Sequence, residues 1–597
     1  MKKIRFMDTS LRDGFQSVFG ARALTDDFIP AVEVAVDAGI DYLEAGGGAR
    51  FQSLFMYCGE SAFDMMDRFR AAAGGKARLQ TLARGINVVA LSAQPRDMID
   101  LHARMFKKHG MTHIRNFDAL NDVRNLTYSG TCIKNAGLHH QVTVTMMELP
   151  PGCSGAHDVD FYMKTLREIL DSGLPYDSIC FKDASGTSNP RKVYETVKAA
   201  RKLLGNDEVI WMHTHETAGV GLLQYQAAIE AGCDGVDLAR PPLSGGTCQP
   251  DILSMWHALK GTDYTLDIDV ARIMEANRVL KECLKDYFFP SEARQVSSEV
   301  ILSPMPGGAL TANTMMMRDT GTLDLYPKVI EAMSECVARG GFGTSVTPVS
   351  QFYFQQAYAN VTQGPWKNIT DGYGNMVLGY FGRTPVEPDA EIVRLAEQQL
   401  GKPVFKGDPL DVIEPGIPKA RAILEKEKLP VTDENIFIIG ALATSKGNKG
   451  LDFLKGKMSV NVRKVSGKRE AEAQMTEPAH SDVERETGPA DYKVTVEGKV
   501  FHVTVEESSG EVKTVEPAPG EAVKPVARIE VRAKLQGIVS QMFISLGDCV
   551  EKGDTLMILE AMKMETPVVA PSDGTVVSIK VEKDQIVKTG QLVATLS

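Results

Sequence analysis

Short apolar or β-branched runs alternate with longer amphipathic stretches along roughly the first 245 residues of the chain. Eight of these runs have the length and composition of strands, and helical patterns separate them, for instance over residues 26–39 and 189–205. Eight strand–helix units in about 250 residues are typical of a TIM barrel, whereas a doubly wound open sheet more often has five or six strands. We therefore predict an α/β fold with a (β/α)8 TIM barrel over residues 1–300. The eight runs are IRFMDTSL, IDYLEAG, LQTLAR, HIRNFDAL, QVTVTMME, SICFKDA, VIWMHTHE and GVDLAR.

Beyond the barrel, the pattern predicts a helical extension and a separate small domain. Residues 301–465 carry helical segments such as EIVRLAEQQLG, which could cover one barrel face. Residues 466–527 begin with a polar stretch without periodicity, which predicts a flexible linker, and include a small β-hairpin with Glu497-Gly498 in its turn. Residues 528–597 are then expected to form an all-β domain on a flexible tether.

Composition excludes several classes of function. The 597 residues carry a net charge of −11, which argues against nucleic acid or an anionic membrane as the main partner. No apolar run approaches the ~18–20 residues that span a bilayer, and the N-terminus MKKIRFMDTS has no apolar core of a signal peptide. The nine cysteines include no CxxC pair, as expected for reduced thiols. We therefore expect a cytoplasmic protein.

An internal repeat organises the last domain. GIVSQMFISLGDCVEKGDTLMIL, from Gly537, aligns with GTVVSIKVEKDQIVKTGQLVATL, from Gly574, which predicts a small β-sandwich with approximate twofold symmetry. The segment EAMKMETP joins the two copies as an exposed hairpin, with Lys563 at its tip. A lone lysine is usually a solvated surface charge, but this position suits a group that is carried between active sites.

EAMKMET resembles the biotin-attachment site of biotinyl carrier domains. Lipoyl domains share the architecture, but two methionines do not usually flank their modified lysine. The resemblance implies that biotin is attached covalently to the ε-amine of Lys563 by a biotin protein ligase.

Polar residues gather at the predicted carboxyl ends of the barrel strands, where barrel active sites lie. MDTSLRDGFQS follows the first strand, LARGIN the third, FKDASG the sixth and MHTHETAG the seventh. His213 and His215 are two residues apart, so both imidazoles face one side of a strand, and Asp13 offers a carboxylate. Such a set suits zinc or a similar ion, although either histidine could instead be a satisfied core residue.

These stretches resemble the carboxyltransferase domain of biotin-dependent enzymes, a family that includes pyruvate carboxylase and the oxaloacetate decarboxylase α subunit. DTSLRDGFQS, LARGIN, FDALND, FKDASG and HTHETAG carry the resemblance, together with SGGTCQP and PMPGGALT. It implies a divalent metal, zinc or else manganese or cobalt. The implied ligands are Asp13, His213, His215 and Lys182 as its carbamate with CO₂. The plain alternative for Lys182 is a salt bridge, for example to Asp183.

The same resemblance implies roles around the substrate. Arg84 would bind a substrate carboxylate, for which its planar fork is suited, and Gln16 would contact the substrate. Thr311 would pass a proton between the substrate and biotin, because a hydroxyl can donate and accept. The alternatives are a structural ion pair for Arg84, a surface amide for Gln16 and an ordinary loop threonine for Thr311.

Four departures from the family leave the substrate open. Phe15, Gly46 and Leu91 replace a histidine, a tryptophan and an aromatic residue of the family, and MMELPPGCSG replaces its SYT segment. We expect these changes to line or approach the pocket.

The implied activity is the transfer of a carboxyl group between carboxybiotin on Lys563 and a small 2-oxo acid, with pyruvate and oxaloacetate as the first expectation. AGGGARF lacks the GK[ST] of a phosphate-binding loop, and no ATP-grasp pattern is found. A separate ATP-dependent biotin carboxylase subunit is therefore expected as partner, as in two-subunit pyruvate carboxylases. A membrane decarboxylase subunit, as for oxaloacetate decarboxylase α, is the alternative. A homo-oligomer is also expected.

Two rival functions stay open at this point. DTSLRDGFQ with paired histidines also resembles metal-dependent aldolases and Claisen-type synthases, and a degenerate barrel could serve only as a scaffold for the carrier.

Overall fold

The computed structural model describes residues 1–444, 447–458, 460–465, 490–496, 499–505, 529–533, 537–561, 564–583 and 585–597. The chain divides into two compact units, Met1–Ser466 and Gly467–Ser597. Lys563 and most of the predicted linker lie outside the described residues, as do Glu497 and Gly498.

Eight parallel strands close into a barrel in the first unit. They follow one another in the order β2 to β8, then β1, and pairing of β1 with β2 closes the ring. A ninth strand, β9 (Tyr264–Leu266), extends the sheet beside β1. The predicted TIM barrel is confirmed. Its strands are β1 (Lys2–Asp8), β2 (Tyr42–Glu44), β3 (Arg78–Ala83), β4 (His113–Asn116), β5 (His139–Thr145), β6 (Ser178–Asp183), β7 (Ile210–Thr214) and β8 (Gly235–Leu238).

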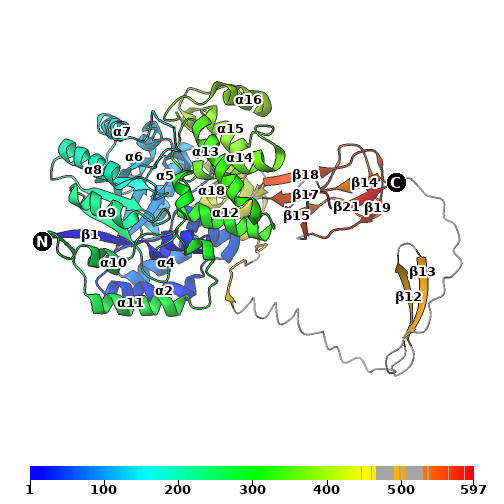
Figure 1. Ribbon diagram of the computed structural model, residues 1–597, viewed down its shortest axis with the longest axis horizontal. Coiled ribbons are helices and arrows are strands. Elements are labelled where there is room, and N and C mark those ends of the chain that lie inside the picture. The colour runs from blue at the N-terminus through cyan, green and yellow to red at the C-terminus, as the bar shows by residue number, and fades with distance from the viewer. Residues whose placement is uncertain are drawn as a thin grey trace. The chain divides into compact units, whose positions relative to one another are not determined.

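Helices cover the outside of this barrel, as Figure 1 shows for α7, α8 and α9. The two helices predicted over residues 26–39 and 189–205 are present as α2 and α8. The start of α8 follows from its sequence, because the Asn189 side chain caps the Lys192 N–H and Pro190 occupies the first turn. The longer barrel helices are α2 (Thr25–Asp37), α4 (Ala62–Ala73), α5 (Arg96–Lys108), α6 (Arg124–Asn135), α7 (Val159–Asp171), α8 (Pro190–Leu204), α9 (Gly221–Glu230) and α11 (Val270–Cys283), with the short helices α1 (Phe15–Phe19), α3 (Gly48–Ser53) and α10 (Ile252–Ala258).

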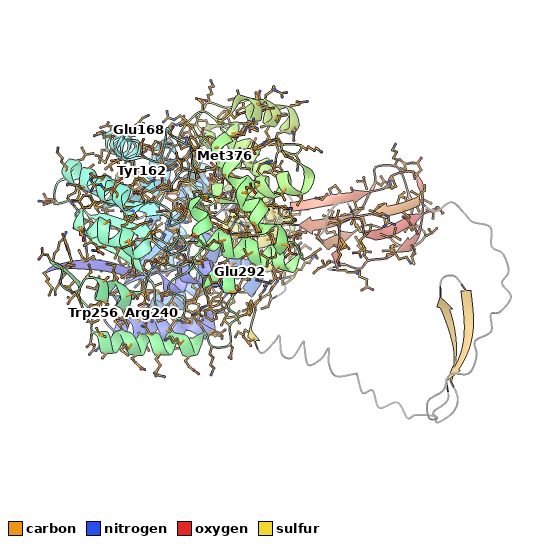
Figure 2. The ribbon with its side chains drawn as sticks, viewed as in Figure 1. Tyr162, Glu168, Arg240, Trp256, Glu292 and Met376 are labelled. Carbon is orange, nitrogen blue, oxygen red and sulfur yellow. The ribbon has the colours of Figure 1, made fainter. Side chains whose placement is uncertain are left out.

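A layer of further helices packs against one side of the barrel in the same unit. Figure 2 labels Met376 in this layer, away from Arg240 and Trp256 of the barrel. Within the described part of the chain, no helix is long and apolar enough to cross a membrane. The helices are α12 (Gly307–Asp319), α13 (Tyr326–Arg339), α14 (Val349–Gln363), α15 (Asp371–Val377), α16 (Ala390–Leu400), α17 (Gly416–Lys426), α18 (Asp433–Ala441) and α19 (Lys449–Leu454), with the strand pair β10 (Ala443–Thr444) and β11 (Gly447–Asn448).

The second unit contains two four-stranded antiparallel sheets and, separately, a hairpin of β12 (Ala490–Val496) and β13 (Lys499–Val505). The sheet strands are β14 (Ile529–Arg532), β15 (Gly537–Met542), β16 (Cys549–Val550), β17 (Thr555–Ala561), β18 (Met564–Val569), β19 (Gly574–Ile579), β20 (Ile586–Val587) and β21 (Leu592–Leu596).

The predicted repeat explains how the two sheets are built. In the first copy β15 pairs with β17, and in the second copy β19 pairs with β21. Each copy also lends a strand to the other sheet, since β20 pairs with β15 and β16 with β19. Equivalent valines of the two copies, Val539 with Val576 and Val550 with Val587, are buried in the common core.

Candidate active site

A small cavity lies at the carboxyl ends of the barrel strands. It measures about 30 Å³. Its barrel side includes Asp13, Gln16, Arg84, Lys182 and His215, all of them residues predicted from the sequence. The helical extension supplies the opposite wall through Pro306, Gly308, Val346 and Thr347.

Three buried side chains in this region converge as a metal site would require. The ligand atoms of Asp13, His213 and His215 lie within 4.8 Å of one another. The Nε2 atoms of His213 and His215 are 3.6 Å and 3.4 Å from Asp13 Oδ2. His213 Nε2 is buried and has no hydrogen-bond partner in the described structure. These three donors fit a divalent metal ion.

The other nitrogen of each imidazole is already committed. His215 Nδ1 donates to the carbonyl oxygen of Thr247 at 2.7 Å. His213 Nδ1 lies 2.6 Å from Asp237 Oδ2. Both contacts favour the tautomer that carries its proton on Nδ1. Nε2 is then unprotonated and its lone pair faces Asp13, as is common in metal-binding histidines.

Asp13 is held as an anion. Burial by itself raises the pKa of its carboxyl, but the charge of Arg12 and the neighbouring His215 and Lys182 side chains lower it well below the usual range. Gln249 Nε2 also donates to Asp13 Oδ2 at 2.9 Å. The carboxylate is therefore available as a ligand at neutral pH.

Lys182 is buried on β6 and pairs in register with His213 on β7. Burial lowers the pKa of its amine to about 8, with Arg115 and Arg12 acting in the same direction against Asp13. The alternative salt bridge to Asp183 is not formed, because that carboxylate accepts backbone N–H groups of the following turn, including those of Gly186 and Ser188. An amine that is neutral far more often than an ordinary lysine therefore lies beside the metal donors.

Arg84 is a buried cation at the cavity wall. Its Nη1 donates to the carbonyl oxygens of Val89 and Ala90 at 2.9 Å and 3.1 Å. No carboxylate pairs with it in the described residues, so the structural ion pair considered from the sequence is absent there. Burial lowers the pKa of the Arg84 guanidinium to about 9, and the charge of Arg12 contributes.

Gln16 and Thr311 occupy different environments. Gln16 lines the cavity, and its Oε1 accepts hydrogen bonds from Arg12 Nη1 and the Ala49 N–H, both at 3.2 Å. Thr311 is fully buried on α12 and donates to the Ser17 carbonyl oxygen. It lies one helical turn after the cavity residue Gly308 and is not among the residues that line the cavity.

Phe15, Gly46 and Leu91, which were expected to line or approach the pocket, are not among the residues that line the cavity. The Phe15 ring packs edge-on against Phe28 of α2, with 5.1 Å between the ring centroids. A Cβ at Gly46 would meet Met66 Sδ of α4 at 2.7 Å, and Leu91 is 40% exposed. None of the three lines the cavity, because the first two face the outer helices of the barrel and the third faces solvent.

Sequence reasoning missed the residues that support His213. Asp237 Oδ1 accepts hydrogen bonds from Trp211 Nε1 at 2.5 Å and Arg115 Nη2 at 3.1 Å, and all of these side chains are buried inside the barrel. A signal was present, since HIRNF and GVDL place Arg115 and Asp237 inside predicted strands. A charge buried in a barrel core needs a partner of opposite sign.

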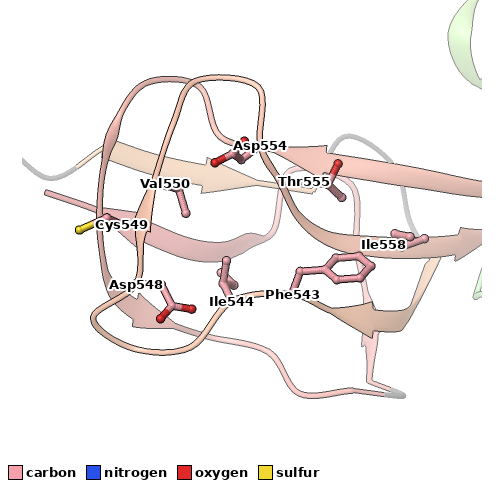
Figure 3. Close-up of a pocket in the computed structure, with 8 residues that line it drawn as sticks. All are labelled: Phe543, Ile544, Asp548, Cys549, Val550, Asp554, Thr555 and Ile558. Carbon is pink, nitrogen blue, oxygen red and sulfur yellow. The ribbon is translucent and has the colours of Figure 1, made fainter.

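A larger hollow of about 610 Å³ lies on the second unit, and Figure 3 shows the side chains around it. Phe543, Ile544, Val550 and Ile558 provide apolar contacts, while Asp548 and Asp554 provide carboxylates. Among the described residues, no lysine, arginine or histidine lines it, so it lacks the groups that would hold an anionic substrate.

Comparison with known families covers almost the whole chain. Residues 3–280 match the HMGL-like family, residues 300–505 the conserved carboxylase domain, and residues 517–596 the biotin-requiring enzyme family.

Individual proteins give the same picture. A pyruvate carboxylase subunit of Methanocaldococcus jannaschii is 29% identical over 571 residues, covering 94% of each chain. The methylmalonyl-CoA carboxyltransferase 5S subunit of Propionibacterium freudenreichii is 29% identical, covering 85% of this chain and 98% of its own. The 2-oxoglutarate carboxylase large subunit of Hydrogenobacter thermophilus is 27% identical, covering 95% and 91%.

A solved structure agrees with these matches. The carboxyl transferase domain of Rhizobium etli pyruvate carboxylase, determined with 3-hydroxypyruvate, superposes with a TM-score of 0.66 at 27% identity, covering 73% of this chain and 75% of that one. The aldolase and scaffold alternatives do not account for a biotin-requiring domain combined with an intact Asp–His–His cluster. Barrel, extension and carrier thus occur together in one chain, which belongs to the biotin-dependent carboxyltransferases.

Proposed function

We propose that the enzyme moves a carboxyl group between carboxybiotin on Lys563 and pyruvate, with oxaloacetate as the carboxylated partner. The observation that carries this proposal is the buried guanidinium of Arg84, which lines the cavity beside the metal donors and pairs with no carboxylate of the described chain. A buried cation of this kind is costly unless a ligand supplies the negative charge.

The cavity wall favours a 2-oxo acid with one carboxylate. Arg12 is already paired with Glu44 and Asp13, and Lys182 is needed as a carbamate. Leu82, Phe117 and Ala184 add largely apolar surface. A second substrate carboxylate, as in 2-oxoglutarate, would find no further cation among the described residues of this wall. A carboxyltransferase for another small 2-oxo acid is the alternative.

Asp13, His213, His215 and carbamylated Lys182 would hold the metal. Imidazole and carboxylate donors suit zinc, and manganese or cobalt also fit. When bound, the metal supplies positive charge that stabilises an enolate oxygen. CO₂ reacts only with a neutral lysine amine, and the lowered pKa of Lys182 supports that step.

Individual side chains bind the substrate and transfer the proton. Arg84 binds the substrate carboxylate with its free N–H groups, and Gln16 contacts the substrate from the adjacent wall. The substrate methyl carbon loses a proton and forms a new bond to the carboxyl carbon, while the bond from that carbon to the biotin ring nitrogen breaks. Thr311 passes the proton to that nitrogen, which requires its hydroxyl to turn away from the Ser17 carbonyl. The reverse sequence decarboxylates oxaloacetate.

Partners are inferred from relatives of similar length. The names of all three relatives reported above describe them as subunits, of a pyruvate carboxylase, a methylmalonyl-CoA carboxyltransferase and a 2-oxoglutarate carboxylase. We therefore expect a separate ATP-dependent biotin carboxylase subunit, a biotin protein ligase and a homo-oligomeric, cytoplasmic enzyme. The alternative is an oxaloacetate decarboxylase α subunit that works with a membrane decarboxylase subunit.

The test uses the purified, biotinylated full chain without partners. Oxaloacetate should release pyruvate in a metal-dependent reaction and leave a carboxyl group on the biotin of Lys563, detected as an increase in intact mass. Lys563→Arg is the matched control, because it keeps the charge and removes the attachment site. Transfer from a 2-oxoglutarate-derived or acyl-CoA carboxyl donor, with none from oxaloacetate, would overturn the pyruvate assignment.

A further inference from the structure

The loop that follows β4 contains FDALND, a motif that matches the family but has no role in the chemistry above. Phe117 at its start lines the cavity. Asn121 near its end is buried and adopts a positive φ of 54°, a conformation that asparagine tolerates better than most residues. This loop therefore places a polar side chain inside the protein.

A short segment of the helical extension faces this loop. Residues 341–347, called the gate segment below, connect α13 to α14, and Val346 and Thr347 form part of the cavity wall. The segment belongs to no helix or strand. It is thus an irregular stretch of backbone that closes a site built mainly by rigid strands.

Thr344 is the residue of the gate segment that binds the FDALND loop. Its backbone N–H donates to the Ala119 carbonyl oxygen at 2.7 Å. Its hydroxyl lies 2.8 Å from the hydroxyl of Thr145 and 3.4 Å from Asn121 Nδ2. All of these residues are buried.

Asn121 joins the loop after β4 to the end of β5 through the same cluster. Its Oδ1 accepts the Thr145 N–H at 2.9 Å, and its Nδ2 donates to the Thr145 carbonyl oxygen at 3.0 Å. One amide side chain thereby fixes the strand end to which Thr344 also binds.

The loop after β5 holds the gate segment from a second side. His157 Nε2 donates to the Phe342 carbonyl oxygen at 2.8 Å, and the Ser345 N–H lies 3.2 Å from Met147 Sδ. The hydroxyl of Tyr162, labelled on α7 in Figure 2, lies 3.2 Å from His157 Nδ1. The contacts that hold the gate segment thus come from two neighbouring strand ends.

Substrate entry requires one of the cavity walls to move. A cavity of about 30 Å³ holds only a few water molecules. Strand ends are tied into the barrel by their ladders, whereas the gate segment makes no ladder hydrogen bonds. Besides the contacts just named, its carbonyl oxygens at Gly343 and Gly341 accept hydrogen bonds from the Tyr353 hydroxyl at 3.1 Å and the Val386 N–H at 3.2 Å. Loops that line a ligand site are commonly among the segments that open at the lowest free energy.

We propose that residues 341–347 form the gate of the carboxyltransferase cavity, and that Asn121 and Thr344 are positioning residues that latch it closed. The proposal rests on the cavity being the substrate site given under Proposed function. The hydrogen bonds of Thr344 hold Val346 and Thr347 against the cavity, and loss of these bonds releases the wall without altering any metal donor.

The test compares Thr344→Val with Thr165→Val in the biotinylated full chain. Both changes remove a buried hydroxyl and its hydrogen bonding, but Thr165 on α7 only donates to the Phe161 carbonyl oxygen. Hydrogen exchange followed by mass spectrometry should show faster exchange in peptides covering residues 341–348 for Thr344→Val alone. The KM for oxaloacetate should rise about two- to tenfold, as expected for one lost hydrogen bond, with a smaller change in kcat.

Exchange at residues 341–348 that is as slow as in the unmodified chain would overturn the latch, as would acceleration spread equally over the barrel. If Thr344→Val does not fold, Thr344→Ala is measured instead, since it removes the same hydroxyl and introduces no β-branched side chain. Exchange is recorded without substrate. A failed reaction with oxaloacetate would therefore refute the proposed function without refuting the latch.

Discussion

Replacement of Arg84 by methionine should make the protein more stable and the enzyme much less active. A pKa lowered from 12.5 to about 9 corresponds to roughly 4–5 kcal/mol of unfavourable free energy for the buried cation. Methionine removes this cost but loses two hydrogen bonds to carbonyl oxygens, worth roughly 1–3 kcal/mol together. A net gain of about 1–4 kcal/mol in the free energy of unfolding is expected.

The activity should change in the opposite direction. Loss of the substrate's buried charge partner should remove about 2–5 kcal/mol of binding free energy. This loss lowers kcat/KM roughly 30- to 4,000-fold, mainly through a higher KM. Thermal unfolding with and without pyruvate, together with steady-state kinetics, measures both effects. Arg240→Met is the matched control, because Arg240 is equally buried but donates to Asp8 at 2.7 Å, and its removal should destabilise by roughly 3–5 kcal/mol. A destabilised Arg84→Met with an unchanged KM would refute the reasoning.

Further substitutions test the proposed metal site and the residues that line the cavity. Asp237→Asn should weaken zinc binding about 10- to 100-fold in equilibrium dialysis, because His213 loses the carboxylate that orients it. Lys182→Arg should abolish the dependence of metal binding on added bicarbonate, since a guanidinium forms no carbamate under these conditions. In the unmodified chain that dependence should strengthen as the pH rises toward about 8, because the neutral amine becomes more abundant. Phe15→His should leave the preference for oxaloacetate unchanged, as measured by relative kcat/KM, because the ring lies outside the cavity.

The barrel and the buried Asp–His–His cluster could be predicted because they depend on strong local patterns. A strand of a parallel barrel is buried on both sides and reads as an apolar run, so all eight strands stand out from the sequence. His213 and His215 share a face by the twofold period of a strand, and that period needs no tertiary information. The same holds for the repeat that pairs Gly537 with Gly574.

The direction in which side chains point on irregular turns could not be predicted from the sequence. Gln16 faces the cavity while Phe15, its neighbour, packs against α2, and no strand period relates the two. The support of His213 by Asp237 and Arg115 was also missed, since Arg115 on β4 reaches across the barrel interior to Asp237 on β8. Such contacts depend on which strands become neighbours across the barrel interior.

These differences bear on where substrate preference resides. Phe15, Gly46 and Leu91 do not line the cavity. The remaining departure, MMELPPGCSG, follows β5 and contains Met147. Met147 Sδ contacts the gate segment at Ser345, next to the wall residue Val346. Metal donors held at the carboxyl ends of β1 and β7 would then serve any enolate, while the position of the gate segment would decide which 2-oxo acid fits beneath it. On this argument, exchange of residues 146–155 for the corresponding segment of a 2-oxoglutarate carboxylase should shift relative kcat/KM, whereas the same exchange at Phe15 should not.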